Sequence, residues 1–154
     1  MRRYDKRARA TGRGKSASFV QLPHDLLRDS KFQALSPNAC KALLFLVTQY
    51  TGYNNGDFGI AWKIAKDKGW TSKGALHAAV EELCEAGFAM LTRQGGRNRC
   101  SLYAVTWFSI DECAGKLDVA ATRVAPRSWR PIGNLSGPRT VQFAPSTVQS
   151  GPEP

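Results

Sequence analysis

The sequence of 154 residues has no long hydrophobic run. Its longest strongly apolar stretch covers six residues, Ala42 to Val47, whereas a helix that crosses a bilayer needs about 20. Arg2 and Arg3 are followed by more charge and not by an apolar segment, so we expect no export signal. These absences argue against a membrane partner and favour a cytoplasmic protein.

Closely spaced cysteine pairs are also missing, since the four cysteines are scattered and none forms a CxxC motif: Cys40, Cys84, Cys100 and Cys113. In a cytosolic protein we expect them to be free thiols and largely buried. A zinc site that combines some of them with His24 or His77 is the less favoured alternative, because no pair has ligand spacing. We therefore expect no metal and no cofactor.

Motifs of catalysis are absent as well. The chain contains no HExxH, no phosphate-binding glycine loop and no evident pair of catalytic carboxylates. We therefore expect a protein that is not an enzyme.

Acidic residues are scarce at the N-terminus. Residues 1–18 hold seven Lys or Arg side chains against Asp5 alone, and so carry +6 of the net charge of +10. Residues 19–112 are nearly neutral, with ten basic and nine acidic side chains. Residues 1–18, here called the arm, have too few apolar residues to form a core and are expected to be disordered. Its charge favours a polyanionic partner.

The neutral part of the chain predicts three main helices. The first begins at Ser36 and Pro37, ends near Gly52, and buries an apolar stripe that Leu44 and Phe45 widen. A short strand over 58–60 precedes a short helix over 61–68 in which Ile64 and Ala65 face inward. The third helix, capped by Thr71 or Ser72, runs to about Glu85. The two inward stripes are Ala39, Ala42, Leu43, Leu46, Val47 and Tyr50, and Leu76, Ala79, Val80 and Leu83.

A hairpin is predicted after the third helix. Strands over 88–92 and 100–107 flank Gly95 and Gly96, a pair typical of a tight turn. Arg93, Arg97 and Arg99 surround this tip without a nearby acid, which favours an anionic partner. The spaced prolines beyond residue 113 predict a mostly disordered tail over 113–154.

The order helix, strand, helix, turn, helix, hairpin predicts a winged helix-turn-helix, a mainly helical α+β fold, over residues 19–112. The chain resembles winged-helix proteins of bacteriophages, prophages and plasmids. The resemblance lies in Leu22-Pro23-His24-Asp25-Leu26-Leu27, Leu35-Ser36-Pro37-Asn38-Ala39, Tyr53-Asn54-Asn55-Gly56-Asp57, Gly69-Trp70-Thr71-Ser72, Ala79-Val80-Glu81-Glu82-Leu83, Ala86-Gly87-Phe88, the wing over 92–99 and the strand over 102–107. It implies binding of double-stranded DNA, in replication initiation or in transcriptional regulation.

The predicted DNA-binding residues come from three places: Thr71, Ser72, Lys73, Gly74, His77 and Ala78 in the third helix, Arg93, Arg97, Asn98 and Arg99 in the hairpin, and Arg2, Arg3, Arg7 and Arg9 in the arm. A helix of this kind fits the major groove, which is about 12 Å wide. Its Ser and Thr hydroxyls and free N–H groups suit phosphate, and its small residues allow close approach. Glu81 and Glu85 are expected either to point away from phosphate or to accept from a cytosine amino group.

Two departures from the resemblance keep an alternative open. Lys68 stands where such proteins usually have an apolar residue, and Ala78 stands where a basic residue is common. Both move the expected affinity onto the hairpin and the arm. The alternative is a winged-helix module that docks onto host machinery or inhibits it. Trp129 is either an anchor for a protein partner or, preferably, an aromatic packed back on the domain or exposed. A homodimer also stays open.

Overall fold

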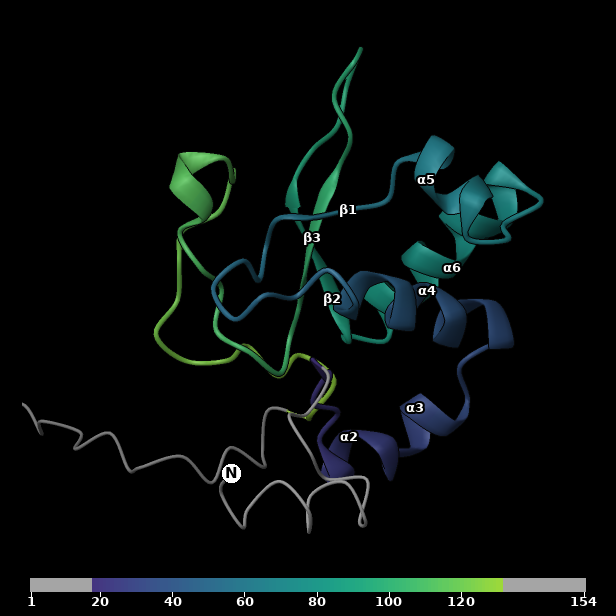
Figure 1. Ribbon diagram of the computed structural model, residues 1–154. Coiled ribbons are helices and arrows are strands. Elements are labelled where there is room, and N and C mark those ends of the chain that lie inside the picture. The colour runs from purple at the N-terminus through teal and green to yellow at the C-terminus, as the bar shows by residue number, and fades with distance from the viewer. Residues whose placement is uncertain (1–17, 132–154) are drawn as a thin grey trace, which may run out of the picture.

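The computed structural model describes residues 18–131, and the predictions for the arm and for residues 132–154 lie outside this range. Within it, the fold is α+β, with five α-helices and a three-stranded antiparallel sheet, as expected (Figure 1). None of these helices has the length and apolar content that a membrane span requires. The elements are α2 (His24–Leu27), α3 (Ser30–Gln33), α4 (Pro37–Val47), β1 (Phe58–Gly59), α5 (Trp62–Asp67), α6 (Lys73–Glu85), β2 (Ala89–Arg93), β3 (Leu102–Val105) and a 3-10 turn (Cys113–Gly115).

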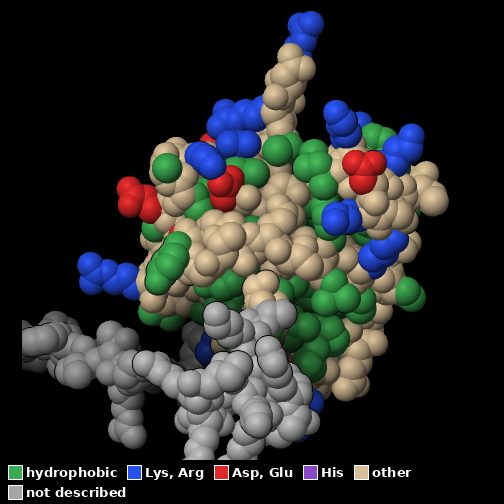
Figure 2. Space-filling model, in the orientation of Figure 1, with side chains coloured by type: hydrophobic (Ala, Val, Ile, Leu, Met, Phe, Trp, Pro, Cys, Tyr) green, Lys and Arg blue, Asp and Glu red, His purple; other side chains and the backbone are tan. Residues whose placement is uncertain are grey.

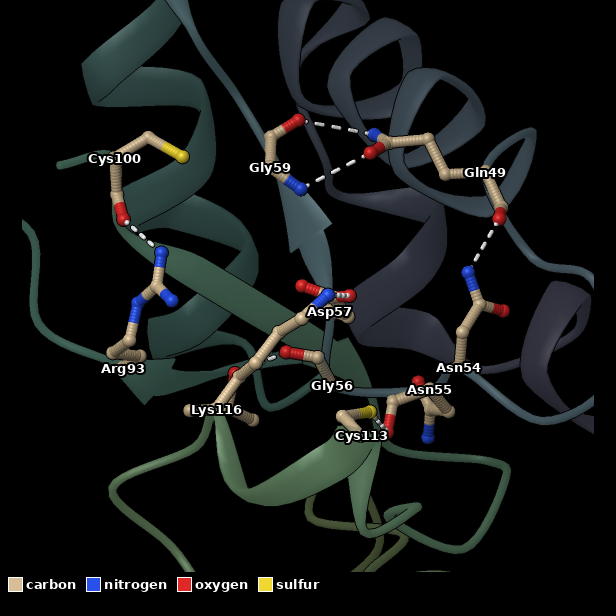
Figure 3. A network of polar contacts seen from close by, with 11 residues as sticks. Gln49, Asn54, Asn55, Gly56, Asp57, Gly59, Arg93, Cys100, Cys113 and Lys116 are labelled. Carbon is tan, nitrogen blue, oxygen red and sulfur yellow. Dashed lines mark hydrogen bonds and ion pairs between the residues drawn. The ribbon is translucent and has the colours of Figure 1, made fainter.

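Helix α4 begins as predicted, because the Ser36 hydroxyl accepts a hydrogen bond from the Ala39 backbone N–H. It ends at Val47 and not near Gly52. The following backbone bonds are of the 3-10 type, from Gln49 N–H to Leu46 C=O and from Tyr50 N–H to Val47 C=O. The Gln49 side-chain amide accepts from Gly59 N–H at 3.0 Å and donates to Gly59 C=O at 3.1 Å (Figure 3). Leu44 does not widen the buried stripe, since 52% of it is exposed.

Helices α4 and α6 pack against each other through the two predicted stripes, which are buried except for the half-buried Tyr50. A polar contact at their edge was not predicted. The Ser36 backbone N–H and hydroxyl each donate to the Glu82 carboxylate, both at 2.6 Å. This contact ties the start of α4 to the side of α6 and sets the side of α6 that is left exposed.

The sheet has the strand order β1-β3-β2. Ala89 pairs with Val105 and Leu91 with Tyr103, and a bulge at Thr92 then shifts the register so that Arg93 pairs with Leu102. The bulged residue is buried, and its hydroxyl donates to Gly56 C=O at 2.6 Å. The hairpin base is thus bonded to the loop that precedes β1.

That loop is held by Asn55, a buried polar residue. Its amide donates to Val105 C=O and Ser109 C=O, both at 2.9 Å, and accepts from Val105 N–H at 2.9 Å. Its backbone N–H donates to the Asp111 carboxylate. Because its amide is bonded on both sides, this residue joins the loop, β3 and the following turn at little desolvation cost.

Residues 111–131, here called the strap, correct the prediction of a disordered tail from residue 113. Trp129 is 1% exposed and stacks on Phe88, with ring centroids 5.9 Å apart. Asp118 N–H donates to Thr92 C=O, so the strap covers the outer edge of β2. A Cβ at residue 87 would lie 2.6 Å from the Ser128 backbone, so only glycine fits there. The proline pattern misled because one large aromatic buries enough surface to anchor a polar segment.

Candidate nucleic-acid interface

The turn between α5 and α6 is built on α4. Gly69 has a φ of +80°, a conformation that glycine adopts without strain. Trp70 follows and is 4% exposed. The Lys41 ammonium donates to Gly69 C=O at 2.8 Å and lies 4.9 Å from the centre of the Trp70 ring. The turn therefore has a defined position relative to the core.

The start of α6 carries the helix residues predicted from the sequence. Ser72 is the cap, and its hydroxyl accepts from Ala75 N–H at 3.2 Å. The predicted residues of this helix are all exposed: Thr71, Ser72, Lys73, Gly74, His77 and Ala78. They lie in or just before the first half of α6, and Gly74, His77 and Ala78 face away from its buried stripe.

The hairpin projects beyond the helices (Figure 1), but its tip differs from the prediction. Gly96 and Arg99 are paired by two backbone hydrogen bonds, so Arg97 and Asn98 form the turn, and Gly95-Gly96 lies between the end of β2 and that turn. Asn98 takes the left-handed conformation, with a φ of +60°, which asparagine tolerates better than most residues. Gly95 is needed for a different reason: a Cβ there would lie 2.6 Å from Ser101 N.

The three hairpin arginines have different environments. Arg97 and Arg99 are exposed at the tip. Arg93 is half-buried, its guanidinium donates to Cys100 C=O at 3.1 Å, and its Nε is buried without a partner in the described residues (Figure 3). Arg93 therefore braces the hairpin and is the predicted contact residue least available to a ligand.

A groove of about 240 Å³ joins the hairpin to α6. Lys73 and His77 line it from α6, and Cys100 and Ser101 line it from the segment just before β3. Its floor is largely apolar, with Ile60, Trp62, Leu76, Val80 and Tyr103. Burial raises the pKa of the Tyr103 phenol, so its hydroxyl keeps its proton. Of the predicted contact residues, Lys73 and His77 line this groove, whereas Arg93, Arg97, Asn98 and Arg99 do not.

Three lysines on and after α5 were not among the predicted contact residues, and one of them, Lys68, lines a different groove on α4. Lys63, Lys66 and Lys68 on and after α5 are exposed, and no ion pair holds them among residues 18–131. Figure 2 shows Lys and Arg side chains at the end of the hairpin and over the α5–α6 region in the same view. The close spacing of the three lysines in and just after the six-residue helix α5 was the sequence signal that could have identified them.

Side-chain direction in α5 explains part of that omission. Ile64, predicted to face inward, is 53% exposed, whereas Ala65 is fully buried. Successive helix residues point about 100° apart, so a helix this short buries only one narrow side. Lys68 is exposed at the end of α5, which shows why an apolar residue is not required at that position.

The cysteines are less buried than predicted. Cys100 is exposed in the groove, and Cys40, Cys84 and Cys113 are half-buried free thiols. Burial, with a smaller contribution from Glu81 and Glu85, raises the pKa of Cys84 to about 11. Among residues 18–131, no three His, Cys, Asp or Glu side chains lie together in a way that could hold a metal ion.

In physical terms, the candidate site consists of exposed cations on α5, at the start of α6 and at the hairpin tip, with a groove between α6 and the residues Cys100, Ser101 and Tyr103 of the hairpin. The predicted arm residues Arg2, Arg3, Arg7 and Arg9 lie outside the described residues. Comparison of the chain with family models, with curated proteins and with solved structures found no match.

Proposed function

We propose that this chain is a non-catalytic protein that binds double-stranded DNA as a winged helix-turn-helix. In this assignment α5, the Gly69 turn and α6 form the helix-turn-helix, and the β2–β3 hairpin is the wing. The start of α6 enters the major groove, and the hairpin tip contacts the backbone beside it. The arm adds further cationic contacts.

The observation that carries the proposal is the groove shared by α6 and the hairpin. Lys73 and His77 border it on one side and the strand that descends from the arginine tip borders it on the other. The exposed cations of the hairpin, Arg97 and Arg99, lie at its tip and do not line the groove, so α6 and the tip can contact the DNA backbone at separate places. The lysines of α5 extend the same charge.

Salt dependence of duplex binding tests the proposal. Contact with about 5–8 phosphates gives a slope of about −5 to −7 in a plot of log K against log salt concentration. We expect the full-length double variant Arg97→Ala, Arg99→Ala to bind all duplexes more weakly, and the magnitude of its salt slope to be smaller by about 2. Fluorescence anisotropy over a salt series measures both quantities.

The matched control removes two positive charges elsewhere. Arg28 follows α2, far from the hairpin tip in Figure 1, and Arg123 lies in the strap, and both are exposed. Arg28→Ala with Arg123→Ala is expected to leave the slope nearly unchanged. Absence of duplex binding at low salt, or binding that ignores salt, contradicts the proposed function. Equal losses in the two double variants contradict the placement of the interface.

A second candidate, docking onto another protein, is favoured by one feature of α4. Leu44 and Phe45 form an open apolar groove with Trp70, and Lys41 and Lys68 border it. If the Leu44→Asp variant binds DNA normally but loses a co-purifying partner protein, this second function is supported. A partner that survives Leu44→Asp contradicts it.

A further inference from the structure

The outward side of α6 changes character halfway along the helix. Its first half presents Lys73, Gly74, His77 and Ala78, which are basic or small, and its second half presents Glu81 and Glu85. All six residues are exposed: Gly74, His77, Ala78, Glu81 and Glu85 face away from the buried stripe, and Lys73 lies at its flank, where it lines the groove with Leu76 and Val80. A phosphate repels the second half, so only the first half suits the DNA backbone.

Glu81 lies at the boundary between the two halves and is paired with His77. The His77 Nδ1 atom lies 3.2 Å from Glu81 Oε1, and the two side chains are 71% and 64% exposed. The two groups form an i,i+4 ion pair when the imidazole is protonated, and the carboxylate has a second oxygen that can accept from another donor. The pair is therefore an oriented acceptor beside a cationic surface.

Access to a base edge is open in front of this pair. Gly74 and Ala78 have no side-chain atoms beyond Cβ, so the first half of α6 can lie deep in a groove. Glu81 is three residues beyond Ala78, about one turn further along the helix. A carboxylate in that position meets base edges or phosphates, and only the base edges offer it hydrogen-bond donors.

We propose that Glu81, oriented by His77, reads a cytosine in the major groove by accepting a hydrogen bond from its N4 amino group; this inference rests on the proposed function. Cytosine offers an amino donor there, whereas the amino group of adenine lies next to the N7 acceptor, which repels a carboxylate. Glu81 determines specificity, and His77 positions its carboxylate.

The test begins with selection of bound duplexes from a random pool by the full-length protein. We then compare binding of the selected site with binding of its single-base-pair variants. The wild-type protein is expected to lose about tenfold in affinity or more when one particular C·G pair is replaced. Glu81→Ala is expected to abolish that preference while other positions of the site keep theirs.

Glu85→Ala is the matched control, because it removes the same charge from the same side of α6, one helical turn away. It is expected to raise affinity for all duplexes alike and to keep the preference. His77→Ala is expected to weaken the preference, and His77→Asn, whose amide can donate to Glu81, to restore part of it. A positioning role predicts this rescue, whereas a purely structural role does not.

The outcomes separate the two proposals. A wild-type protein that binds no duplex at low salt overturns the proposed function and this inference together. A wild-type protein that binds every duplex equally well leaves the proposed function standing and overturns the inference. A Glu81→Ala protein that behaves like Glu85→Ala, or a lost preference at a pair other than C·G, also overturns the inference.

Discussion

The base and the tip of the hairpin both carry arginines, but the two parts of the hairpin differ in how they are bonded to the rest of the protein. At the base, Thr92 donates to Gly56, and Gln94 N–H donates to the Asp118 carboxylate at 2.9 Å. At the tip, the backbone bonds of Gly96 and Arg99 join only each other. The comparison teaches that a cluster of arginines in the sequence divides into one that braces the fold and two that project from it.

The largest effect is expected from detaching the strap that fixes the base. Trp129→Ala removes a buried indole and is expected to lower the free energy of unfolding by about 3–5 kcal/mol. Urea denaturation measures this change. Val124→Ala, at an exposed position of the strap, is the control and is expected to change stability by less than about 0.5 kcal/mol. Similar small effects of both variants would show that the strap does not support the base.

Asn55→Ala removes the contacts that join the loop before β1 to β3 and to the following turn. It leaves buried groups of β3 and the following turn without partners, and we expect a loss of about 3 kcal/mol in unfolding free energy. Asn54→Ala is the control, because Asn54 bonds to Gln49 and Thr51 within its own loop. Its expected loss is about 1 kcal/mol. If the control variant is the less stable one, the buried amide is not the main link.

Two hairpin arginines test the comparison directly. Arg93→Ala is expected to lower the unfolding free energy by about 1 kcal/mol, because the hydrogen bond to Cys100 C=O and the packing of a half-buried side chain are lost. Arg97→Ala is expected to leave stability within about 0.5 kcal/mol, and under the proposed function to weaken DNA binding. Thermal unfolding and anisotropy measured on the same samples separate the two effects. A reversed pattern would contradict the division of the hairpin into base and tip.

Thiol labelling sharpens the comparison without altering stability. A pH of 8 is well below the Cys84 pKa of about 11, so this thiol stays protonated and reacts slowly. Cys100 is exposed in the groove and is expected to react faster. Cys100→Ser should therefore remove the fastest phase of labelling, and Cys84→Ser should leave it in place. Under the proposed function, duplex DNA slows that phase because it covers the groove.

Much of the fold could be predicted from periodicity and end signals. The starts of α4 and α6 follow from Ser36 and Ser72, whose hydroxyls cap the helices, and the helical apolar spacing identified the buried stripes. These features are local, because a cap and an amphipathic stripe depend on residues within a few positions of each other. The same spacing also predicted the exposed residues of α6 in the candidate site, because they lie outside its buried stripe.

The errors concern contacts between distant residues. The Ser36–Glu82 bond joins residues 46 positions apart, and the burial of Trp129 depends on Phe88, far away in the chain. The position of the hairpin tip depended on the register of β2 and β3, including the bulge at Thr92. No short window of sequence contains both partners of such contacts, so composition and spacing could not predict them.

Local sequence thus accounted for the helices, their inward sides and the existence of the hairpin, because capping and amphipathic spacing act over one or two turns. Tertiary structure alone decided which cations share a surface. It brought Lys73 and His77 to one groove with Cys100 and Ser101, turned Arg93 inward at the hairpin base, and left Arg97 and Arg99 exposed at the tip. The physical reason is that the free energy of a charge depends on burial and on neighbours, which the packing of distant segments determines.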